Sequence, residues 1–317
     1  MTTSVKPIVG IILLILSTWA LSTQEASAKW LMELSLPLFL LILVRYALHV
    51  VIVLTITLPK KGMAVFRSRH YLMQVVRGST SLFAALTVFM ALSYLPQAEA
   101  TAIYFLAPLL VLCIAPWFLG EAMRWHRWVA AFVGFLGVMV IVRPSAGLNP
   151  IGVMYGLLAA VVIATQFLCT RKLADDDSMT TLLWTGIVGF VASLVLVPLQ
   201  WTEGIAVLEE FKLWQWLLLL NTGVFGTVGH LLQIKAYQRA SASLLAPFSY
   251  LQIIAAAALG LAIWGQFPDM WGWFGIFIVC ASGVVVTMIE WRDNRRVNKL
   301  VQGIIESKQS IKNNKST

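Results

Sequence analysis

The chain of 317 residues is 59% hydrophobic and only 12% charged, with a formal net charge of +9. Soluble domains carry about a quarter charged residues, so this composition excludes an ordinary water-soluble protein and indicates a surface that mostly faces lipid. The positive charge does not indicate nucleic-acid binding, because the cations follow the membrane topology described below. The three cysteines stand singly in apolar stretches without metal-ligand or redox spacing, so we expect neither a metal site nor a cofactor.

Ten apolar runs have about the length of a transmembrane helix, which needs about 20 mostly apolar residues. Short gaps separate these runs, so we predict an all-α membrane protein of ten transmembrane helices without a soluble domain. In chain order, the predicted spans are 8–28, 37–58, 72–94, 97–119, 127–143, 150–170, 180–200, 213–235, 243–265 and 270–289.

Lysine and arginine residues predict the orientation of these helices, because cytoplasmic loops carry an excess of them. With the N-terminus inside, nearly all of these cations fall in cytoplasmic loops, near the termini or in the basic tail after the last span. The opposite side would hold only Lys29, Arg143 and Lys212. We therefore predict a multi-pass protein with both termini in the cytoplasm.

The first span also imitates a secretory signal. An apolar run is followed by Ala26-Ser27-Ala28, which has the pattern of a cleavage site. The segment before the run is only weakly basic, and the internal repeat described below requires this helix. We therefore expect the first helix to be retained.

One face of the first helix is polar, and polar groups inside a membrane indicate function by default. Thr18, Ser22, Glu25 and Lys29 recur at intervals of three and four residues. Glu25 and Lys29 have the spacing of an ion pair, which on one interpretation is a satisfied pair at the outer interface. On the other, Glu25 takes up a proton or binds an ammonium group of a substrate, since a carboxyl group withdrawn from water can exchange protons near neutral pH.

Polar and aromatic side chains recur at helical spacing on four later spans. From the fourth span to the ninth they are Gln97, Thr101, Tyr104, Tyr155, Gln166, His230, Gln233, Tyr237 and Tyr250. Such stripes can be interhelical hydrogen bonds, worth about 0.6 kcal/mol each, or the lining of a cavity. His230 is the side chain most suited to titrate at mid-membrane depth.

The chain reads as two halves of five helices. Residues 77–143 align with residues 222–288 at a constant offset, under which Gly78 meets Gly223. Because five is an odd number, the second half must lie inverted in the membrane relative to the first. Inverted repeats are typical of secondary transporters, whose substrate site lies near the midplane between the repeats.

Several motifs belong together with this repeat. Residues 91–103 open the fourth span and residues 119–121 (Leu-Gly-Glu) follow it, while residues 246–251 occupy the corresponding place in the second half. Jointly they resemble the EamA-type drug/metabolite transporters, and the resemblance covers nearly the whole chain up to Trp291. One departure is residues 264–266 (Trp-Gly-Gln), which stand where the second half would repeat Leu-Gly-Glu.

The resemblance implies two inverted five-helix repeats, residues 1–145 and 146–291, followed by a basic cytoplasmic tail, residues 292–317. It also implies a bacterial inner membrane location and a central cavity lined by helices 1, 3, 4, 6, 8 and 9. Arg45, with His49 one turn later, is a cation inside the second span. It could hold an anionic group of the substrate or fasten the second helix to its neighbours, and we favour the second interpretation because the family places this helix away from the cavity.

We therefore predict a secondary transporter that moves a small amphipathic organic metabolite, amino-acid-like or cofactor-like, by alternating access. The predicted substrate-binding residues are Thr18, Ser22, Glu25, Lys29, Thr101, Tyr104, Gln166, His230, Gln233, Tyr237 and Tyr250. The expected partners are a small-molecule substrate and the lipid bilayer, while protons as the coupling ion and a homodimer are left open. We expect no enzyme activity, but a lipid-modifying membrane enzyme and a structural membrane subunit stay as alternatives.

Overall fold

A computed structural model describes residues 5–119, 125–143, 147–173, 176–239, 245, 248–289 and 292. Helices account for the first five predicted spans. They are α1 (Val5–Glu33), α2 (Leu38–Lys61) with the short η1 (Gly62–Phe66), α3 (Tyr71–Tyr94), α4 (Gln97–Tyr104) with α5 (Ala107–Leu119), and α6 (Trp125–Ile141). The Gly-Glu part of the Leu-Gly-Glu motif and the tail beyond Arg292 lie outside the described residues.

The second half repeats this order. Its helices are α7 (Pro150–Lys172), α8 (Ser178–Leu196) with η3 (Val197–Gln200) and α9 (Trp201–Glu209), α10 (Leu213–Arg239), α12 (Leu251–Trp264) and the helix Met270–Ile289. Eight segments are long and apolar enough to cross a membrane, and Trp125–Ile141 and Leu251–Trp264 are shorter apolar helices. The described residues contain no strand, and the predicted all-α membrane fold with ten helices is confirmed.

The fourth span differs from its prediction, because it is broken instead of continuous. Helix α4 ends at Tyr104 and α5 begins at Ala107. Pro108 has no backbone N–H with which to bond the carbonyl of Tyr104, so a continuous helix would lose that bond and clash with the proline ring. In the first turn of α5, where no such bond is required, the proline is tolerated. The seventh span is longer than predicted, because α8 continues through η3 into α9.

The packing of the helices is reciprocal between the two halves. Helix α1 packs on α10 as α7 packs on α3, and α2 contacts α10 as α8 contacts α3. Helices α2 and α8 face one another, as do α4 and α12. A two-fold axis that exchanges the halves produces this pattern, so the prediction of two inverted five-helix repeats is also confirmed.

Two glycines that the repeat pairs with one another occupy corresponding contacts. Gly78 on α3 lies directly against the side chain of Val188 on α8, and Gly223 on α10 lies against Leu48 on α2. A β-carbon at either glycine would come within 2.7 Å of its neighbour. Small residues let membrane helices approach this closely, so the matched glycines preserve the same helix contact in both repeats.

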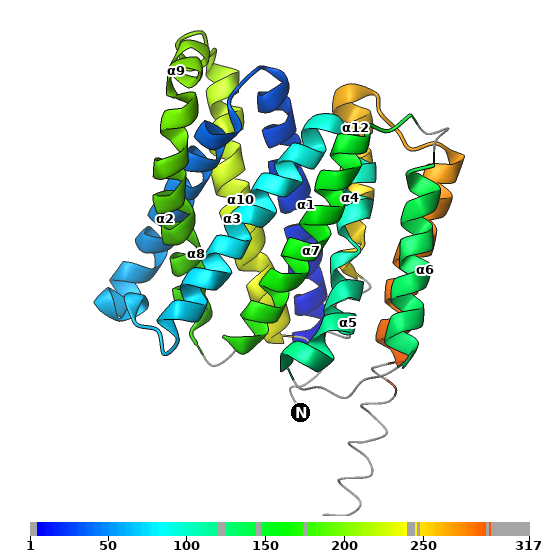
Figure 1. Ribbon diagram of the computed structural model, residues 1–317. Coiled ribbons are helices and arrows are strands. Elements are labelled where there is room, and N and C mark those ends of the chain that lie inside the picture. The colour runs from blue at the N-terminus through cyan, green and yellow to red at the C-terminus, as the bar shows by residue number, and fades with distance from the viewer. Residues whose placement is uncertain are drawn as a thin grey trace, which may run out of the picture.

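The two ends of the bundle carry the residues that the charge pattern assigns to opposite sides (Figure 1). The beginning of α1, the α2–α3 connection and the α7–α8 connection lie at one end, and α9 and the α1–α2 connection lie at the other. We call these the inner and the outer end. Helix α6 lies beside Met270–Ile289, where Gly137 and Gly275 bring the two backbones together.

Candidate functional site

The polar face of α1 is buried in the bundle, although it belongs to an otherwise apolar helix. Thr18, Ser22, Glu25 and Lys29 are each at most 7% exposed. The adjacent face of α1 packs closely on α10, where Ser17 donates a hydrogen bond to the carbonyl of Gly229 at 2.7 Å. The second half of α1, residues 20–31, therefore lies in the interior of the protein, and its polar face is turned toward α4 and α12.

Glu25 is bonded to residues of both repeats. The hydroxyl of Tyr104 on α4 lies 2.9 Å from its Oε2, and Nε2 of Gln252 on α12 donates to its Oε1 at 3.1 Å. The Tyr104 hydroxyl also lies 3.1 Å from Oγ1 of Thr101. We call Glu25, Thr101, Tyr104 and Gln252 the Glu25 cluster. All four side chains are less than 9% exposed, so the cluster is closed off from water.

Glu25 and Lys29 do not form the ion pair that one of the two interpretations of their spacing supposed. Lys29 Nζ instead donates to the carbonyl of Leu95 at 2.8 Å and to Oε1 of Gln266 at 3.3 Å, and it lies 5.0 Å from the centre of the Trp264 ring. The spacing permits the pair, but Glu25 turns toward two donors at the centre of the bundle. Lys29 extends instead toward acceptors at the outer end.

Gln97 and Ser22 extend the Glu25 cluster. Gln97 Nε2 donates to the carbonyl of Ser22 at 2.9 Å, and Ser22 Oγ donates to the carbonyl of Gln252 at 3.2 Å. The Oε1 atom of Gln97 is buried and has no hydrogen-bond partner. Thr18 bonds only within its own helix, to the carbonyl of Ile15. An unused acceptor therefore lies beside the Glu25 cluster.

The number of hydroxyl protons in this cluster indicates which form of Glu25 fits it. Thr101 Oγ1 donates its single proton to the carbonyl of Gln97 at 2.7 Å, so Tyr104 must donate toward Thr101 for that contact to be a hydrogen bond. Tyr104 has only one proton, so its bond with Glu25 then requires a proton from the glutamic acid. The contacts are all satisfied when Glu25 is protonated, and one is lost when it is ionised.

The other predicted site residues lie elsewhere in the bundle. Gln166 on α7 donates to Oγ of Ser81 on α3 at 3.0 Å. His230 and Gln233 on α10 are half-buried and hydrogen-bond one another. The side chain of Tyr237 lies outside the described part of the chain.

Tyr250 also lies apart from the Glu25 cluster. Its ring centre is 5.5 Å from that of Phe105, and its hydroxyl lies against the backbone of Gly283 in the last helix. That hydroxyl is buried without a hydrogen-bond partner. The structure thus brings together Glu25, Thr101 and Tyr104 from the predicted set, with Ser22 and Thr18 on the same face of α1.

Gln252 is the member of the cluster that sequence reasoning missed. It is the second residue of α12 and stands two residues after Tyr250, at the beginning of an apolar run. A lone amide in an apolar span is itself a signal of function. Its partner depends on how α12 packs on α1, which no local pattern specifies.

A second polar cluster joins the two repeats at the inner end. Asp177 accepts hydrogen bonds from the first turn of α8 and pairs with Lys61 of α2 at 2.6 Å. Asp176 accepts from Nε2 of Gln74 at 3.0 Å and from the backbone of Arg69 at 3.1 Å. Asp176 and Asp177 therefore bond to residues of the first repeat, while Asp175 lies outside the described residues.

The charge of Asp177 is maintained by its partners. Partial burial raises the pKa of the Asp177 carboxyl, but the hydrogen bonds from Lys61 and from the backbone of Thr180 outweigh burial, so this pKa lies below its ordinary value. The side chains of Lys61 and Asp177 are 41% and 45% exposed. This cluster is therefore an ionised, water-exposed contact, unlike the Glu25 cluster.

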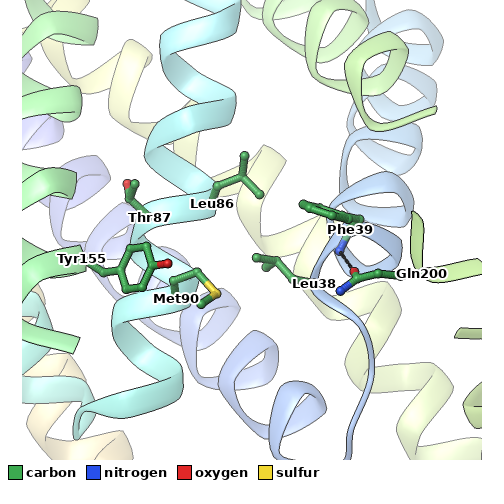
Figure 2. Close-up of a pocket in the computed structure, with 7 residues that line it drawn as sticks. All are labelled: Leu38, Phe39, Leu86, Thr87, Met90, Tyr155 and Gln200. Carbon is green, nitrogen blue, oxygen red and sulfur yellow. Dashed lines mark hydrogen bonds between the residues drawn. The ribbon is translucent and has the colours of Figure 1, made fainter. Parts of the chain in front are cut away.

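A pocket of about 320 Å³ opens on the outer half of the bundle, between α2, α3, α7 and η3. Figure 2 shows Leu38, Met90 and Tyr155 directed into a common space, with Gln200 bonded to the backbone of Phe39 at its rim. The other lining residues are Leu86 and Thr87. None of the predicted substrate-binding residues lines this mainly apolar pocket.

Comparison with known proteins agrees with the repeat and with the architecture. Residues 8–143 and 150–288 each match the profile described as the EamA-like transporter family. A solved crystal structure superimposes with a TM-score of 0.60 at 21% identity, covering 92% of this chain and 99% of that chain. At this identity the likeness shows the fold alone.

Curated relatives are similar over most of their length. An S-adenosylmethionine uptake transporter of Rickettsia bellii is 28% identical over 231 residues, which are 72% of this chain and 77% of that protein. A pseudopaline exporter of Pseudomonas aeruginosa is 26% identical over 88% of this chain and 93% of its own. A riboflavin transporter of Vibrio cholerae is 26% identical over 92% of this chain and 96% of its own.

Proposed function

Because the chain belongs to the EamA-like transporter family, we propose that it moves an amino-acid-like or cofactor-like metabolite by alternating access, with Glu25 as its proton-exchanging group. The observation that carries this proposal is the position of Glu25 between the repeats. Its two oxygens are bonded to α4 of the first repeat and to α12 of the second. Rocking of one repeat against the other would have to break one of these bonds.

Binding and release of a proton by Glu25 would control when its bonds to Tyr104 and Gln252 break. The protonated acid satisfies every contact of the Glu25 cluster, so proton binding favours the closed arrangement. Loss of the proton leaves a charge in a dry site with one bond too few, and a buried charge without full compensation is costly. An ammonium group of a substrate could then replace the proton, with Gln97 Oε1 as a second acceptor.

The relatives support an organic substrate of moderate size. Their names specify S-adenosylmethionine, pseudopaline and riboflavin, and Thr101, Tyr104 and the two glutamines offer neutral polar and aromatic contacts suited to such molecules. We propose that the residues predicted on α1 and α4 bind the substrate. His230 and Gln233 on α10 and Gln166 on α7 would contact it in other stages of the cycle.

The same proposal includes the membrane topology. Residues 1–145 and 146–291 would form the two repeats, the tail 292–317 would lie in the cytoplasm, and both termini would face the cytoplasm of a bacterial cell. Each chain then contains a complete pathway across the inner membrane, so a homodimer would join two independent units. An enzyme of lipid modification would need reactive groups near one interface, whereas the Glu25 cluster is closed in the interior.

Reconstitution into liposomes tests this proposal. Purified protein is assayed with a metabolite panel that includes S-adenosylmethionine and riboflavin, with and without a pH difference across the membrane. We expect saturable flux of at least one metabolite that responds to the pH difference. Flux that does not change with the pH difference would refute proton exchange by Glu25. The absence of both flux and binding for a broad panel would refute the transporter proposal itself.

A further inference from the structure

Arg45 of α2 is partly buried, and within the described residues no counter-charge contacts its guanidinium group. The group lies 5.2 Å from the centre of the Tyr46 ring and 5.4 Å from the centre of the Phe89 ring. Its Nη1 atom is buried and has no hydrogen-bond partner. Arg45 is the eighth residue of α2, about 10 Å from the start of that helix at 1.5 Å per residue, and the aromatic rings hold its charge inside the protein.

Arg45 lies near Gly226 of α10, which packs closely against Gln24 of α1. Gly226 of α10 has no side chain, and a β-carbon there would lie 3.5 Å from Nε of Arg45 and 2.8 Å from Oε1 of Gln24. Gln24 is only 3% exposed and precedes Glu25 on α1. The guanidinium therefore lies beside the adjacent face of the helix that carries the Glu25 cluster.

Arg45 shares its surroundings with a second arginine, Arg77. Its charge acts on His49 and on His230, and Arg77 acts on both histidines as well. Arg77 is bonded to the neutral oxygens of Thr170, Thr181 and Thr185. Within the described residues, neither arginine forms an ion pair.

Glu25 is the acid that acts on this group electrostatically, but its two oxygens are already bonded to Tyr104 and Gln252. The guanidinium of Arg45 therefore keeps an unused donor. A charge buried in a membrane protein is costly unless a partner compensates it, and the protein supplies none in contact with Nη1.

From this arrangement we infer that Arg45 binds an oxyanion of the transported molecule, a carboxylate or a phosphate. The inference rests on the proposed transport function and specifies its substrate class as organic anions and zwitterions. The planar guanidinium presents paired N–H donors that match both oxyanions. This inference replaces our initial interpretation that Arg45 only fastens α2 to its neighbours. His49 fills that role through its bond to the carbonyl of Leu182 at 3.0 Å.

The first test needs no knowledge of the substrate. Thermal unfolding of the purified full chain is followed at constant ionic strength while chloride is replaced by acetate, glutarate or inorganic phosphate. An anion that binds the native state raises its apparent stability. We expect a rise for the wild-type protein and for the control Lys60→Gln, which removes an exposed cation from the same helix, but none for Arg45→Gln.

The three anions separate the two sources of an oxyanion. A rise with acetate or glutarate indicates a carboxylate site, and a rise with phosphate alone indicates a phosphoryl site. Arg45→Lys keeps the charge but loses the paired donors, so it should show a smaller rise and serves if Arg45→Gln does not fold. Equal rises in all variants, or none in the wild type, would overturn the inference.

A second test uses a transported solute identified in liposomes. Its carboxyl amide or phosphate-free analogue should bind the wild-type protein roughly 30-fold or more weakly, as expected when one member of a buried charge pair is removed. Arg45→Gln should bind both forms equally. Flux of an uncharged solute with no preference for its acidic analogue would refute the Arg45 inference alone. The absence of all flux would refute the transport proposal, while the anion titration by thermal unfolding could still be interpreted.

Discussion

Two polar clusters, one around Glu25 and one around Asp176 and Asp177, connect the repeats of this protein. The surroundings of these acids differ more than their hydrogen bonds do. Glu25 accepts or shares bonds with Tyr104 and Gln252 in the closed interior, and Asp176 and Asp177 accept comparable bonds at the inner end. Water can solvate the charge of Asp177, which is nearly half exposed, while it cannot reach Glu25. The bonds alone therefore do not decide whether an acid can work as a switch.

This contrast assigns different roles to the two clusters. An exposed ion pair contributes little to stability, because water competes for both charges. A buried acid changes the energy of its surroundings strongly whenever it gains or loses a proton. We infer that the inner-end cluster holds loops in place and that the Glu25 cluster couples protonation to the packing of the repeats.

The largest effect is expected for Glu25→Gln. The amide resembles the protonated acid and can keep its bonds to Tyr104 and Gln252, so the protein should fold normally. Flux driven by a pH difference in liposomes should fall to the background of empty liposomes. Asp176→Asn is the control at the inner end and should retain most of the flux, so equal losses in the two variants would erase the distinction between the clusters.

A smaller effect is expected for Tyr104→Phe. The change leaves Oε2 of Glu25 and Oγ1 of Thr101 without this partner, and a buried polar group that loses its bond costs about 1–3 kcal/mol. Thermal unfolding should show this loss, and pH-driven flux should fall less than in Glu25→Gln. Tyr94→Phe, at an exposed tyrosine, provides the matched control, and equal stabilities of the two variants would contradict the bonding described for the cluster.

Asp177→Ala should change stability more than transport. It removes the cap of α8, and loss of such a cap costs about 0.5–2 kcal/mol. Asp177→Ser keeps a capping oxygen while losing the ion pair to Lys61, so it should recover most of the stability. A flux per folded molecule that drops as far as in Glu25→Gln would show that the inner end takes part in coupling.

The smallest effect concerns pH. Because the pKa of Asp177 in the folded protein lies below the ordinary value of 3.8, its ionised form stabilises the protein above that value. This contribution is lost as the pH falls from about 4 through the lowered pKa. The melting temperatures of the wild-type protein and of Asp177→Asn should therefore differ slightly at pH 5, and the difference should shrink steadily as the pH falls below 3.8. A difference that grows at low pH would have the wrong sign.

The helices could be predicted from the sequence because apolar length is a local property. All ten predicted spans correspond to apolar helices, and the break before Pro108 could have been predicted from the missing N–H of that proline. The candidate site was less accessible to prediction. Helical spacing placed Glu25 and Lys29 on one face but could not show that their side chains turn to different partners.

Contacts between residues far apart in the sequence could not be predicted from helical spacing. The bond from Gln252 to Glu25 joins residues 227 positions apart, and it depends on how α12 packs on α1. The guanidinium of Arg45 likewise lies beside Phe89 on α3 and near Gly226 on α10, which are far from it in the sequence. A buried polar residue can be recognised in a sequence, but its partner requires the fold.

The choice of Glu25 as the one proton-exchanging group has a consequence for the energy that this protein can use. Helix α7, the counterpart of α1 in the second repeat, contains no acidic residue, so the proposed cycle carries one proton at this position. Without a contribution from the membrane potential, one proton for each substrate molecule can sustain at most a tenfold concentration ratio per unit of pH difference, or about 1.4 kcal/mol. The number of protons exchanged at Glu25 thus sets the steepest substrate gradient that a pH difference alone could support.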